Sequence, residues 1–505
     1  MHPNFLKAQV LTKSNHLIRK TFILSAILAA FITSCTNKPT PSNSTSTLSF
    51  DLDSIMKRGK LIAVTDFNST NYFLYKGEPM GFHYELLKEF TEHLGIDLEI
   101  ITENHLDHAF NFLKTGEADL LAIGLTVSTE RKKEIQFTDP IFETRQVLVQ
   151  RKPRNWKSMT EETISRHLIR NQLNLAHKTV YVQENSIHLD RLRTLAGEIG
   201  DTVNIIAVPY ESEDLIKNVA SGEIDYTVCD ENIARVNATY YTGIDVNTPV
   251  SFPQNIAWGV RRINSGTLLD ELNSWIASYR KTTDYALLYA KYFKNSRSSI
   301  IVKSDYYSLS TGKISRWDDL IKIASEDIDW DWRLLSSLVC QESRFDPDVE
   351  SWAGAIGLMQ VMPSTGEHFG IDITSSPRNN IKAGTMYINW LSSFYELKVP
   401  DENERIKFIL ASYNAGPGHV LDAMKLAEKH GMDPQKWDGN VAVWLLKKSE
   451  PAHYNDALVK NGFFKGTESI NFVTEVLDRY EHYKNIVPVA DRHLTMLSDD
   501  QVHNK

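Results

Sequence analysis

Hydrophobic positions follow one pattern in the first part of the chain and another in the last third. Over residues 55–297, short apolar runs such as "LIAVTD", "DLEIIT", "TVYVQE" and "NIIAVPY" alternate with segments in which apolar residues recur at helical spacing. Such runs predict buried strands, and their alternation with amphipathic helices predicts βα units around a mostly parallel sheet. The alternation occurs in two successive sets, so we expect two similar α/β lobes.

The pattern becomes helical after a linker expected at residues 298–314. From "DDLIKIASE" to "VTEVLDRYEHYKNIV", apolar residues recur at intervals of three and four, with little strand signal between them. This spacing predicts a mainly α-helical domain over residues 315–490, followed by a tail at 491–505. The predicted fold class is therefore multidomain, with a bilobal α/β part followed by a mainly α part.

The N-terminus has the layout of a secretion signal. Lys13, Arg19 and Lys20 precede the apolar run "TFILSAILAAFIT", which is too short to span a bilayer comfortably. The run ends in "ITSC", which resembles the bacterial lipoprotein signal and implies that Cys35 becomes the lipidated N-terminus. A plain signal peptide with an incidental cysteine is the alternative. Residues 36–54 are rich in Ser, Thr, Asn and Pro, which predicts a flexible tether.

Composition narrows the classes of function. The chain has 505 residues, of which 42% are hydrophobic and 24% charged, as expected for two or three globular domains. The net charge is -9 and no Lys/Arg-rich block is present, so we expect no nucleic-acid partner. Cys229 and Cys340 have no second ligand at metal-binding spacing, so we expect buried thiols, with a disulfide as the alternative. We expect no metal and no cofactor.

The α/β part resembles a known family of binding proteins. "GKLIAVTD", "MGFHYELLKEFTEHLGIDLEI" and "VASGEIDYTVCDENIAR" are similar to the family 3 extracellular solute-binding proteins, which bind amino acids between two lobes. The resemblance implies that Thr126 and Arg131 of "GLTVSTER" hold a ligand carboxylate and that Asp230 holds its ammonium. A guanidinium can bind a carboxylate through two parallel hydrogen bonds. The alternative is that Arg131 is solvated beside Lys132 and Lys133.

One loop of this part differs from the family. The stretch "FNSTNYFLYKGEPMG" stands where members usually have a proline and an aromatic residue. The resemblance therefore leaves the ligand of the module open between an amino acid and a muropeptide.

The segment "QESRFDPDVESWAGAIGLMQ" places a carboxylate on an apolar helical face. Leu335, Leu338 and Val339 lie seven, four and three positions before Glu342, so all four side chains share one face. An ionised carboxylate on such a face is costly unless it is paired or protonated, so we expect a partner or a raised pKa.

Two neighbouring segments have helix-ending and loop signals. In "ERIKFILASYNAGPG", Tyr413 continues the apolar face of a helix that ends at Asn414 and the glycines after it. Gly354 and Gly357 of "GAIGLMQVMPST" permit close backbone approach, and we expect Ser364 to form a capping box with the glutamate three residues later.

Three ordered motifs, "ESRF", "GAIGLMQ" and "SYNAG", resemble the soluble-lytic-transglycosylase-like domain, a relative of goose lysozyme. The resemblance implies that Glu342 is the catalytic acid, and Phe472 stands where the family normally has a tyrosine. The residues it implies for substrate binding are Ser343, Met359, Gln360, Tyr413, Asn414 and Phe472.

The resemblance also implies a reaction and a location. The reaction is cleavage of the β-1,4 bond between N-acetylmuramic acid and N-acetylglucosamine in peptidoglycan, with a 1,6-anhydro product formed without water. A water-using muramidase and a non-catalytic lipoprotein that binds glycan and solute are the alternatives. The order of modules behind a lipoprotein signal resembles the membrane-bound lytic murein transglycosylases. This resemblance implies a lipid anchor in the outer membrane, with the enzyme facing the periplasm.

Overall fold

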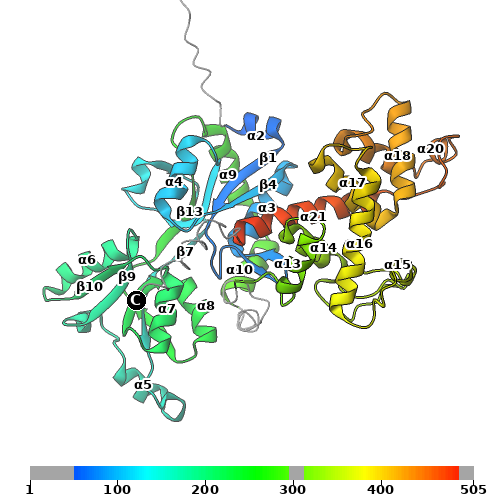
Figure 1. Ribbon diagram of the computed structural model, residues 1–505. Coiled ribbons are helices and arrows are strands. Elements are labelled where there is room, and N and C mark those ends of the chain that lie inside the picture. Colours follow the sequence, from blue (N-terminus) through cyan, green and yellow to red (C-terminus); the bar gives the residue numbers. More distant parts are fainter. Residues whose placement is uncertain (1–50, 295–311, 488–505) are drawn as a thin grey trace, which may run out of the picture. The chain divides into compact units, whose positions relative to one another are not determined.

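The computed structural model describes residues 51–294 and 312–487 (Figure 1). Cys35, the signal, most of the tether and linker, and the tail lie outside the described residues. Helix α2 (Leu52–Arg58) is capped by Asp51, so the folded part begins a few residues before the expected boundary at 55. Within the described part of the chain, no helix is both long and apolar enough to cross a membrane.

The first lobe is built on a mixed sheet with the strand order β4, β1, β5, β13, β6, and β7 pairs with β13. Strands β4, β1 and β5 are parallel, whereas β13 is antiparallel to β5. The strands are Lys60–Thr65 (β1), Asp97–Thr102 (β4), Leu120–Thr126 (β5), Ile135–Phe137 (β6), Phe142–Thr144 (β7) and Gln254–Arg261 (β13). The helices of this lobe are Phe82–Leu94 (α3), Leu106–Thr115 (α4), Gly266–Tyr279 (α9) and Thr283–Phe293 (α10).

The second lobe contains a five-stranded sheet with the order β10, β9, β11, β8, β12. Strands β9, β10 and β11 are parallel, and β8 is antiparallel to both of its neighbours. The strands are Gln146–Arg151 (β8), Thr179–Gln183 (β9), Asn204–Val208 (β10), Tyr226–Asp230 (β11) and Ile244–Pro249 (β12). The helices are Glu161–His167 (α5), Ile187–Ile199 (α6), Ser212–Ser221 (α7) and Glu231–Tyr240 (α8). The two predicted α/β lobes are thus confirmed, and the chain returns to the first lobe through β13.

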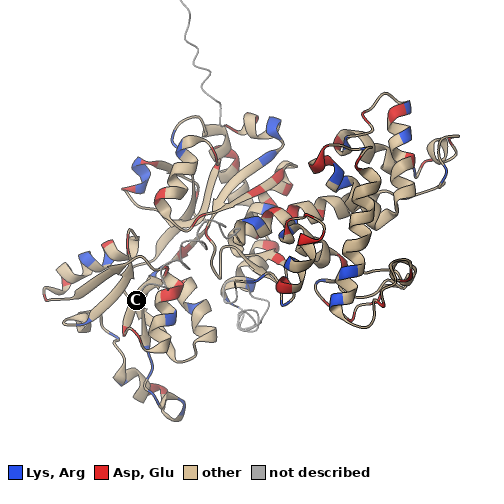
Figure 2. Ribbon diagram, in the orientation of Figure 1, with Lys and Arg blue, Asp and Glu red and all other residues tan. Residues whose placement is uncertain are grey.

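The remainder of the chain is mainly helical, as predicted, and surrounds one apolar core. Its helices are Asp318–Glu326 (α13), Trp332–Ser343 (α14), Pro363–Phe369 (α15), Pro377–Tyr395 (α16), Glu402–Ala415 (α17), Pro417–Lys429 (α18), Ala442–Lys447 (α19), Pro451–Tyr454 (α20) and Thr467–Ile486 (α21). Helix α15 begins with Pro363 at its first turn and has no side-chain cap, so the expected capping box at Ser364 is wrong. Proline is favoured at this position because its missing N–H would have no partner there. Basic and acidic residues are interspersed along the described elements (Figure 2).

A hairpin of the first lobe contributes to the core of the helical domain. The hairpin consists of β2 (Phe73–Tyr75) and β3 (Glu78–Met80), and Leu74 is buried in the same apolar cluster as the residues of α14. At the turn, the carbonyl oxygen of Gly77 accepts a hydrogen bond of 2.8 Å from the hydroxyl of Tyr483. Gly77 has a φ of 78°, and a Cβ there would lie 2.6 Å from Phe345. The turn therefore has no room for a side chain.

We expect Gly77→Ala to destabilise the protein by about 1–3 kcal/mol more than Gly59→Ala, because it adds a methyl group to a filled core. Gly59 is a matched control, since its φ is 77° and no atom lies within 4 Å of a Cβ built there. Both variants carry the same strain of a positive φ, so the difference between them measures packing. Urea unfolding of the full-length chain gives both values, and equal losses in the two variants would contradict the packing described for the hairpin.

Candidate functional sites

Glu342 lies in the last turn of α14, at the end of a face that is otherwise buried. Leu335, Leu338 and Val339 are fully buried on this face, as predicted, while Glu342 itself is partly buried. Immediately after the helix, Arg344 (φ 51°) and Phe345 (φ 63°) adopt left-handed conformations that are uncommon for residues other than glycine. The chain thus turns sharply away from the helix just beyond Glu342, and Phe345 returns to the core.

The surroundings of Glu342 favour its neutral form. Burial raises the pKa of the Glu342 carboxyl to about 8, and no neighbouring charge contributes to the shift. Within the described residues, no hydrogen bond to this carboxylate is formed that would stabilise its charge. A carboxyl group in such surroundings keeps its proton at neutral pH and can act as a general acid.

Tyr413 lies close to Glu342 and is held by the loop between the two helices. Its hydroxyl donates a hydrogen bond of 2.8 Å to the carbonyl oxygen of Met359. Burial raises the pKa of Tyr413 well above its usual value, and the nearby Glu342 raises it further. The side chain of Met359 is fully buried and packs against Gly384. Met359 therefore contributes its backbone carbonyl to this arrangement, and its side chain belongs to the core.

Ser343 holds the loop against α14, and Gln360 closes the loop on itself. The hydroxyl of Ser343 is buried and lies 2.8 Å from the carbonyl oxygen of Leu358. The side-chain amide of Gln360 donates to the carbonyl oxygens of Val349 and Gly357, each at 3.0 Å. In this structure, the polar groups of both residues bind backbone and position the loop beside Glu342.

Asn414 and Phe472 belong to different surroundings. Asn414 is exposed at the end of α17, where its side-chain oxygen accepts a hydrogen bond of 2.5 Å from the hydroxyl of Ser469 on α21. Phe472 is only 6% exposed and is part of the core of the helical domain. Asn414 is thus available at the surface, whereas the ring of Phe472 packs internally.

Sequence reasoning missed one residue that shapes this site. Asn380 on α16 is buried, its side-chain oxygen accepts from the backbone N–H of Met359 at 2.9 Å, and its amide donates to the carbonyl oxygen of Ile356 at 2.8 Å. A Cβ on Gly357 would lie 2.6 Å from this amide, so the expected close approach is confirmed there, whereas no atom lies within 4 Å of a Cβ on Gly354 and the expectation is wrong at that position. The sequence feature that could have identified Asn380 is a polar residue on the otherwise apolar face of the helix at 377–395.

Aromatic side chains continue from Tyr413 along α16. The ring of Tyr387 lies 5.5 Å from that of Tyr413, and Trp390 lies 5.9 Å from Tyr387 at an angle of 12°. Phe394 follows at 5.5 Å from Trp390. The row joins the surroundings of Glu342 to the exposed surface of α16, where Trp390 is 42% exposed.

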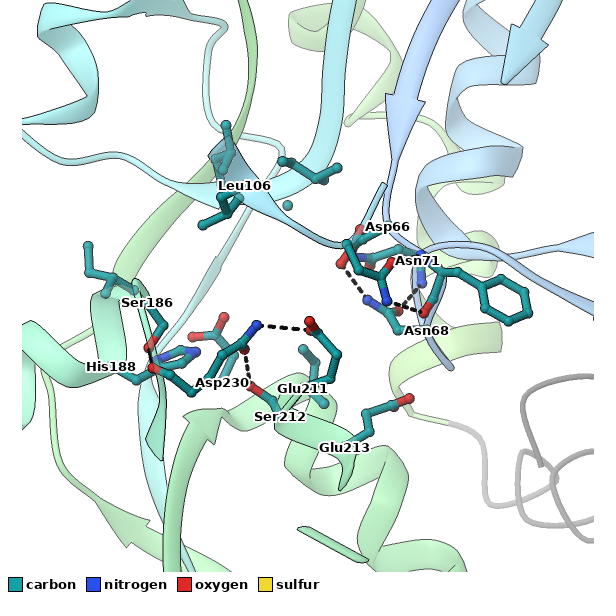
Figure 3. A pocket seen from close by; sticks show the side chains of 18 of the residues that line it. Asp66, Asn68, Asn71, Leu106, Ser186, His188, Glu211, Ser212, Glu213 and Asp230 are labelled. Carbon is teal, nitrogen blue, oxygen red and sulfur yellow. Dashed lines mark hydrogen bonds between the residues drawn. The ribbon is translucent and has the colours of Figure 1, made fainter. Parts of the chain in front are cut away.

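A second candidate site is a cavity of about 780 Å³ between the two α/β lobes (Figure 3). Thr126 at the end of β5, Arg131 shortly after it, and Asp230 at the end of β11 all line this cavity. The guanidinium of Arg131 donates to the carbonyl oxygen of Thr126 at 3.2 Å. Burial raises the pKa of Asp230, while the charges of His188 and Arg131 lower it. The structure therefore brings the three predicted binding residues to one cavity.

Comparisons with known proteins match both parts of the chain. The family of bacterial extracellular solute-binding proteins, family 3, matches residues 61–295, and the transglycosylase SLT domain matches residues 319–435. A membrane-bound lytic murein transglycosylase F of Desulfosudis oleivorans is 32% identical over 432 residues, which cover 85% of this chain and 91% of the relative. The chain belongs to the membrane-bound lytic murein transglycosylase F family. It is accordingly a peptidoglycan lytic transglycosylase with a solute-binding module.

The chain is also similar to a second curated relative and to a solved structure. A relative of the same name from Pseudomonas fluorescens is 27% identical over 434 residues, which cover 85% of this chain and 86% of the relative. Among solved structures, a mutant of ArgBP from T. maritima is 25% identical with a TM-score of 0.41, and the match covers 48% of this chain and 99% of that one.

Cys229 and Cys340 of this transglycosylase are both buried free thiols, as predicted.

The raised pKa of Glu342 predicts a pH-dependent effect on stability. Between the usual pKa of 4.5 and about 8, the folded chain keeps a proton that the unfolded chain releases, so the stabilising contribution of Glu342 is lost as pH rises through this window. Glu342→Gln removes this ionisation, so we expect the stability of the variant relative to the native chain to increase from pH 5 to pH 9. Urea unfolding midpoints at several pH values measure the effect. Glu367→Gln, at an exposed position on α15, is the control and should follow the native chain at every pH. If the unfolding midpoints of Glu342→Gln and the native chain change with pH in parallel, the prediction is wrong.

Proposed function

We propose that Glu342 alone serves as acid and then base in a non-hydrolytic cleavage of peptidoglycan. The bond cleaved is the β-1,4 bond between N-acetylmuramic acid and N-acetylglucosamine, and the product is a 1,6-anhydromuramyl end. The observation that carries the proposal is the carboxyl of Glu342, whose pKa burial raises to about 8 without a charged neighbour. Such a group is ready to donate a proton near neutral pH.

The proposed reaction returns Glu342 to its starting state. The carboxyl proton passes to the bridging oxygen as the bond between this oxygen and the anomeric carbon of N-acetylmuramic acid breaks. The resulting carboxylate then accepts the proton of the 6-hydroxyl of the same sugar while the 6-oxygen bonds to the anomeric carbon. One chain end becomes a free 4-hydroxyl and the other a 1,6-anhydro ring, so no water is consumed.

The surroundings of Glu342 support a mechanism with a single carboxylate. Glycosidases that retain configuration usually place a second carboxylate about 5 Å from the acid. The nearest acidic residues in the sequence, Asp346 and Asp348, are both exposed, and the side chain of Asp346 accepts a hydrogen bond of 3.0 Å from the backbone N–H of Asp348. They hold the turn after α14, so the substrate's own hydroxyl is the better candidate for the nucleophile.

Other residues would position the glycan. Tyr413 would orient the reacting sugar beside Glu342, since its hydroxyl is held by the loop. Asn414 is exposed next to it and can bind polar groups of the sugar. The aromatic row that includes Trp390 can pack against sugar rings further along the strand. Ser343, Gln360 and the buried Phe472 would act indirectly by supporting this arrangement.

We expect the full-length chain, purified in detergent, to release peptidoglycan fragments that are lighter by one water than reducing-end fragments. Glu342→Gln should reduce the release by at least about 100-fold because it cannot supply the proton. Mass spectrometry of the soluble products measures both effects. The exposed Glu367→Gln variant should release the same products as the native chain. Reducing-end products would instead indicate a water-using muramidase, and full activity of Glu342→Gln would exclude Glu342 as the acid.

The proposed location is the periplasmic face of the outer membrane. The support for this proposal is the lipoprotein-like signal that ends at Cys35, together with the name of the family, which describes its members as membrane-bound. Cleavage before Cys35 and acylation of its thiol would tether the enzyme next to its substrate by lipid chains.

We expect Cys35→Ser to move the protein from the membrane fraction to the soluble periplasmic fraction or to block its processing, because serine offers no thiol for acylation. Incorporation of labelled palmitate and fractionation of cells measure the change. Thr36→Ser is the control and should be labelled like the native chain. Equal labelling of the Cys35→Ser variant would refute lipidation at this residue.

The proposed role of the α/β module is to sense a solute, either an amino acid or a muropeptide. Arg131 and Thr126 would hold the α-carboxylate of the ligand, and Asp230 would hold its ammonium. The shared cavity, the guanidinium of Arg131 and the opposite charge of Asp230 support this assignment. The module would occupy residues 55–297 with the short helical extension before it, and the catalytic domain residues 315–490.

A further inference from the structure

The cavity between the lobes contains two separate groups of charged residues. Asp230 interacts electrostatically with His188 and Arg131, whereas Asp66 interacts with Glu211 and Glu213. Figure 3 shows His188 and Asp230 on one side of the view and Asp66 with Asn68 and Asn71 on the other. We call Asp66, Glu211 and Glu213 the acidic group. Within this view, Asp66 lies apart from Asp230, which is proposed to hold the α-ammonium of an amino acid.

The acidic group draws its residues from both lobes. Asp66 follows β1 in the first lobe, and Glu211 and Glu213 lie at the start of α7 in the second. The backbone N–H of Ser69 in the first lobe donates to Glu213 at 3.2 Å, and the hydroxyl of Ser69 also contacts this carboxylate. A ligand that binds the acidic group would therefore contact both lobes.

The hydrogen-bond donors to the acidic group are neutral. Asp66 accepts from the amides of Asn68 at 2.5 Å and Asn71 at 2.7 Å, and Glu211 accepts from the amide of Gln183 at 2.9 Å. Glu213 accepts from Ser69 and from the amide of Asn237 at 2.9 Å. Among the ion pairs formed by the described residues, none includes a carboxylate of this group.

Three buried carboxylates that form no ion pair with the described residues are costly. Burial raises the pKa of Asp66 to about 7, and the charges of Glu211 and Glu213 raise it further. The pKa values of Glu211 and Glu213 are raised as well, again chiefly by burial. Besides Arg131, the lining includes the exposed residues His105 and Lys217, and the charge of His105 only partly offsets the effect of burial on Glu211. A cation supplied by a ligand would relieve this unfavourable arrangement.

Two buried polar atoms in the cavity have no hydrogen-bond partner among the described residues. His188 lines the cavity and is only 7% exposed, yet its Nδ1 has no hydrogen-bond partner among the described residues. The buried Oδ1 of Asp230 also lacks a partner there. Buried polar atoms normally have partners, so these two indicate that a polar ligand occupies this side of the cavity.

We propose that the module binds an amino acid with a cationic side chain, whose ammonium or guanidinium group is held by Asp66 and Glu211 beside Glu213. This inference rests on the proposed function of the module, in which Arg131 holds the α-carboxylate of the ligand and Asp230 holds its α-ammonium. It adds the class of side chain, which the acidic group selects by charge. Neutral side chains of the same length would leave the carboxylates without a counter-ion.

The experiment compares pairs of ligands that differ mainly in side-chain charge. L-lysine with L-norleucine and L-arginine with L-citrulline are titrated by calorimetry into the full-length chain in detergent. We expect the cationic member of at least one pair to bind at least about tenfold more tightly than its neutral counterpart. Meso-diaminopimelate carries an additional carboxylate beside its side-chain ammonium, so we expect it to bind less tightly than lysine. This comparison distinguishes a site for basic amino acids from a site for the diamino acids of the cell wall.

Variants distinguish the residues proposed to bind the ligand's side chain from those proposed to bind its α-carboxylate and α-ammonium. Asp66→Asn and Glu211→Gln should reduce the preference for the cationic member, whereas Arg131→Met should weaken both members of a pair alike. Glu223→Gln is the control, since it removes the same charge at an exposed position after α7. Thermal unfolding identifies any variant that fails to fold, and the unsubstituted chain with its ligand pairs still tests the proposal in that case.

The outcomes distinguish the inference from the proposed function. Equal binding of both members of each pair would overturn the cationic class and leave amino-acid binding in place. A preference that persists in Asp66→Asn and Glu211→Gln would overturn the placement of the cation, and tighter binding of meso-diaminopimelate than lysine would overturn the side-chain class. No binding of any of these amino acids would overturn the cationic class and leave a muropeptide as the proposed ligand of the module. Stabilisation by calcium chloride in the absence of an amino acid would overturn the placement of the ligand's cation, because the acidic group would then bind a metal ion.

Discussion

The burial of a single carboxylate at the end of an apolar helix is the constraint on which the catalytic domain depends. Helix α14 packs its leucines into the core, and Glu342 lies where this packing ends. The same helix must therefore remain fixed for the carboxyl to stay partly buried and protonated. The left-handed residues after it, the loop held by Asn380 and the ring of Phe345 all serve to hold this position. The packing of α14 and the raised pKa of Glu342 therefore follow from the same arrangement.

This packing also joins the two parts of the chain. Leu74 of the first lobe is buried in the core of the helical domain, and the turn at Gly77 lies against Phe345, which follows α14 by two residues. The side chain of Arg479 on α21 contacts Glu78 of the same hairpin at 3.3 Å. The solute-binding module therefore contributes side chains to the support of α14, although its own cavity is built from other elements.

The sequence predicted the two kinds of fold because, in each, apolar residues recur at a regular spacing along the chain. The strand and helix alternation of the α/β lobes and the helical spacing after it were both confirmed, as were the buried cysteines and the apolar face before Glu342. The return of the chain to the first sheet through β13 was not predicted, because strand order depends on contacts between distant segments. The capping box at Ser364 was wrong because the preceding proline already begins the helix.

By itself, the sequence determined the motifs, their order and the position of Glu342 on an apolar face, since these depend only on spacing along the chain. Only the tertiary structure decided what surrounds that carboxyl, because its pKa depends on burial by segments far apart in sequence. The same holds for the cavity of the module. Asp66 and Glu211 lie on different lobes, and no local pattern reveals that folding brings their charges close enough to interact.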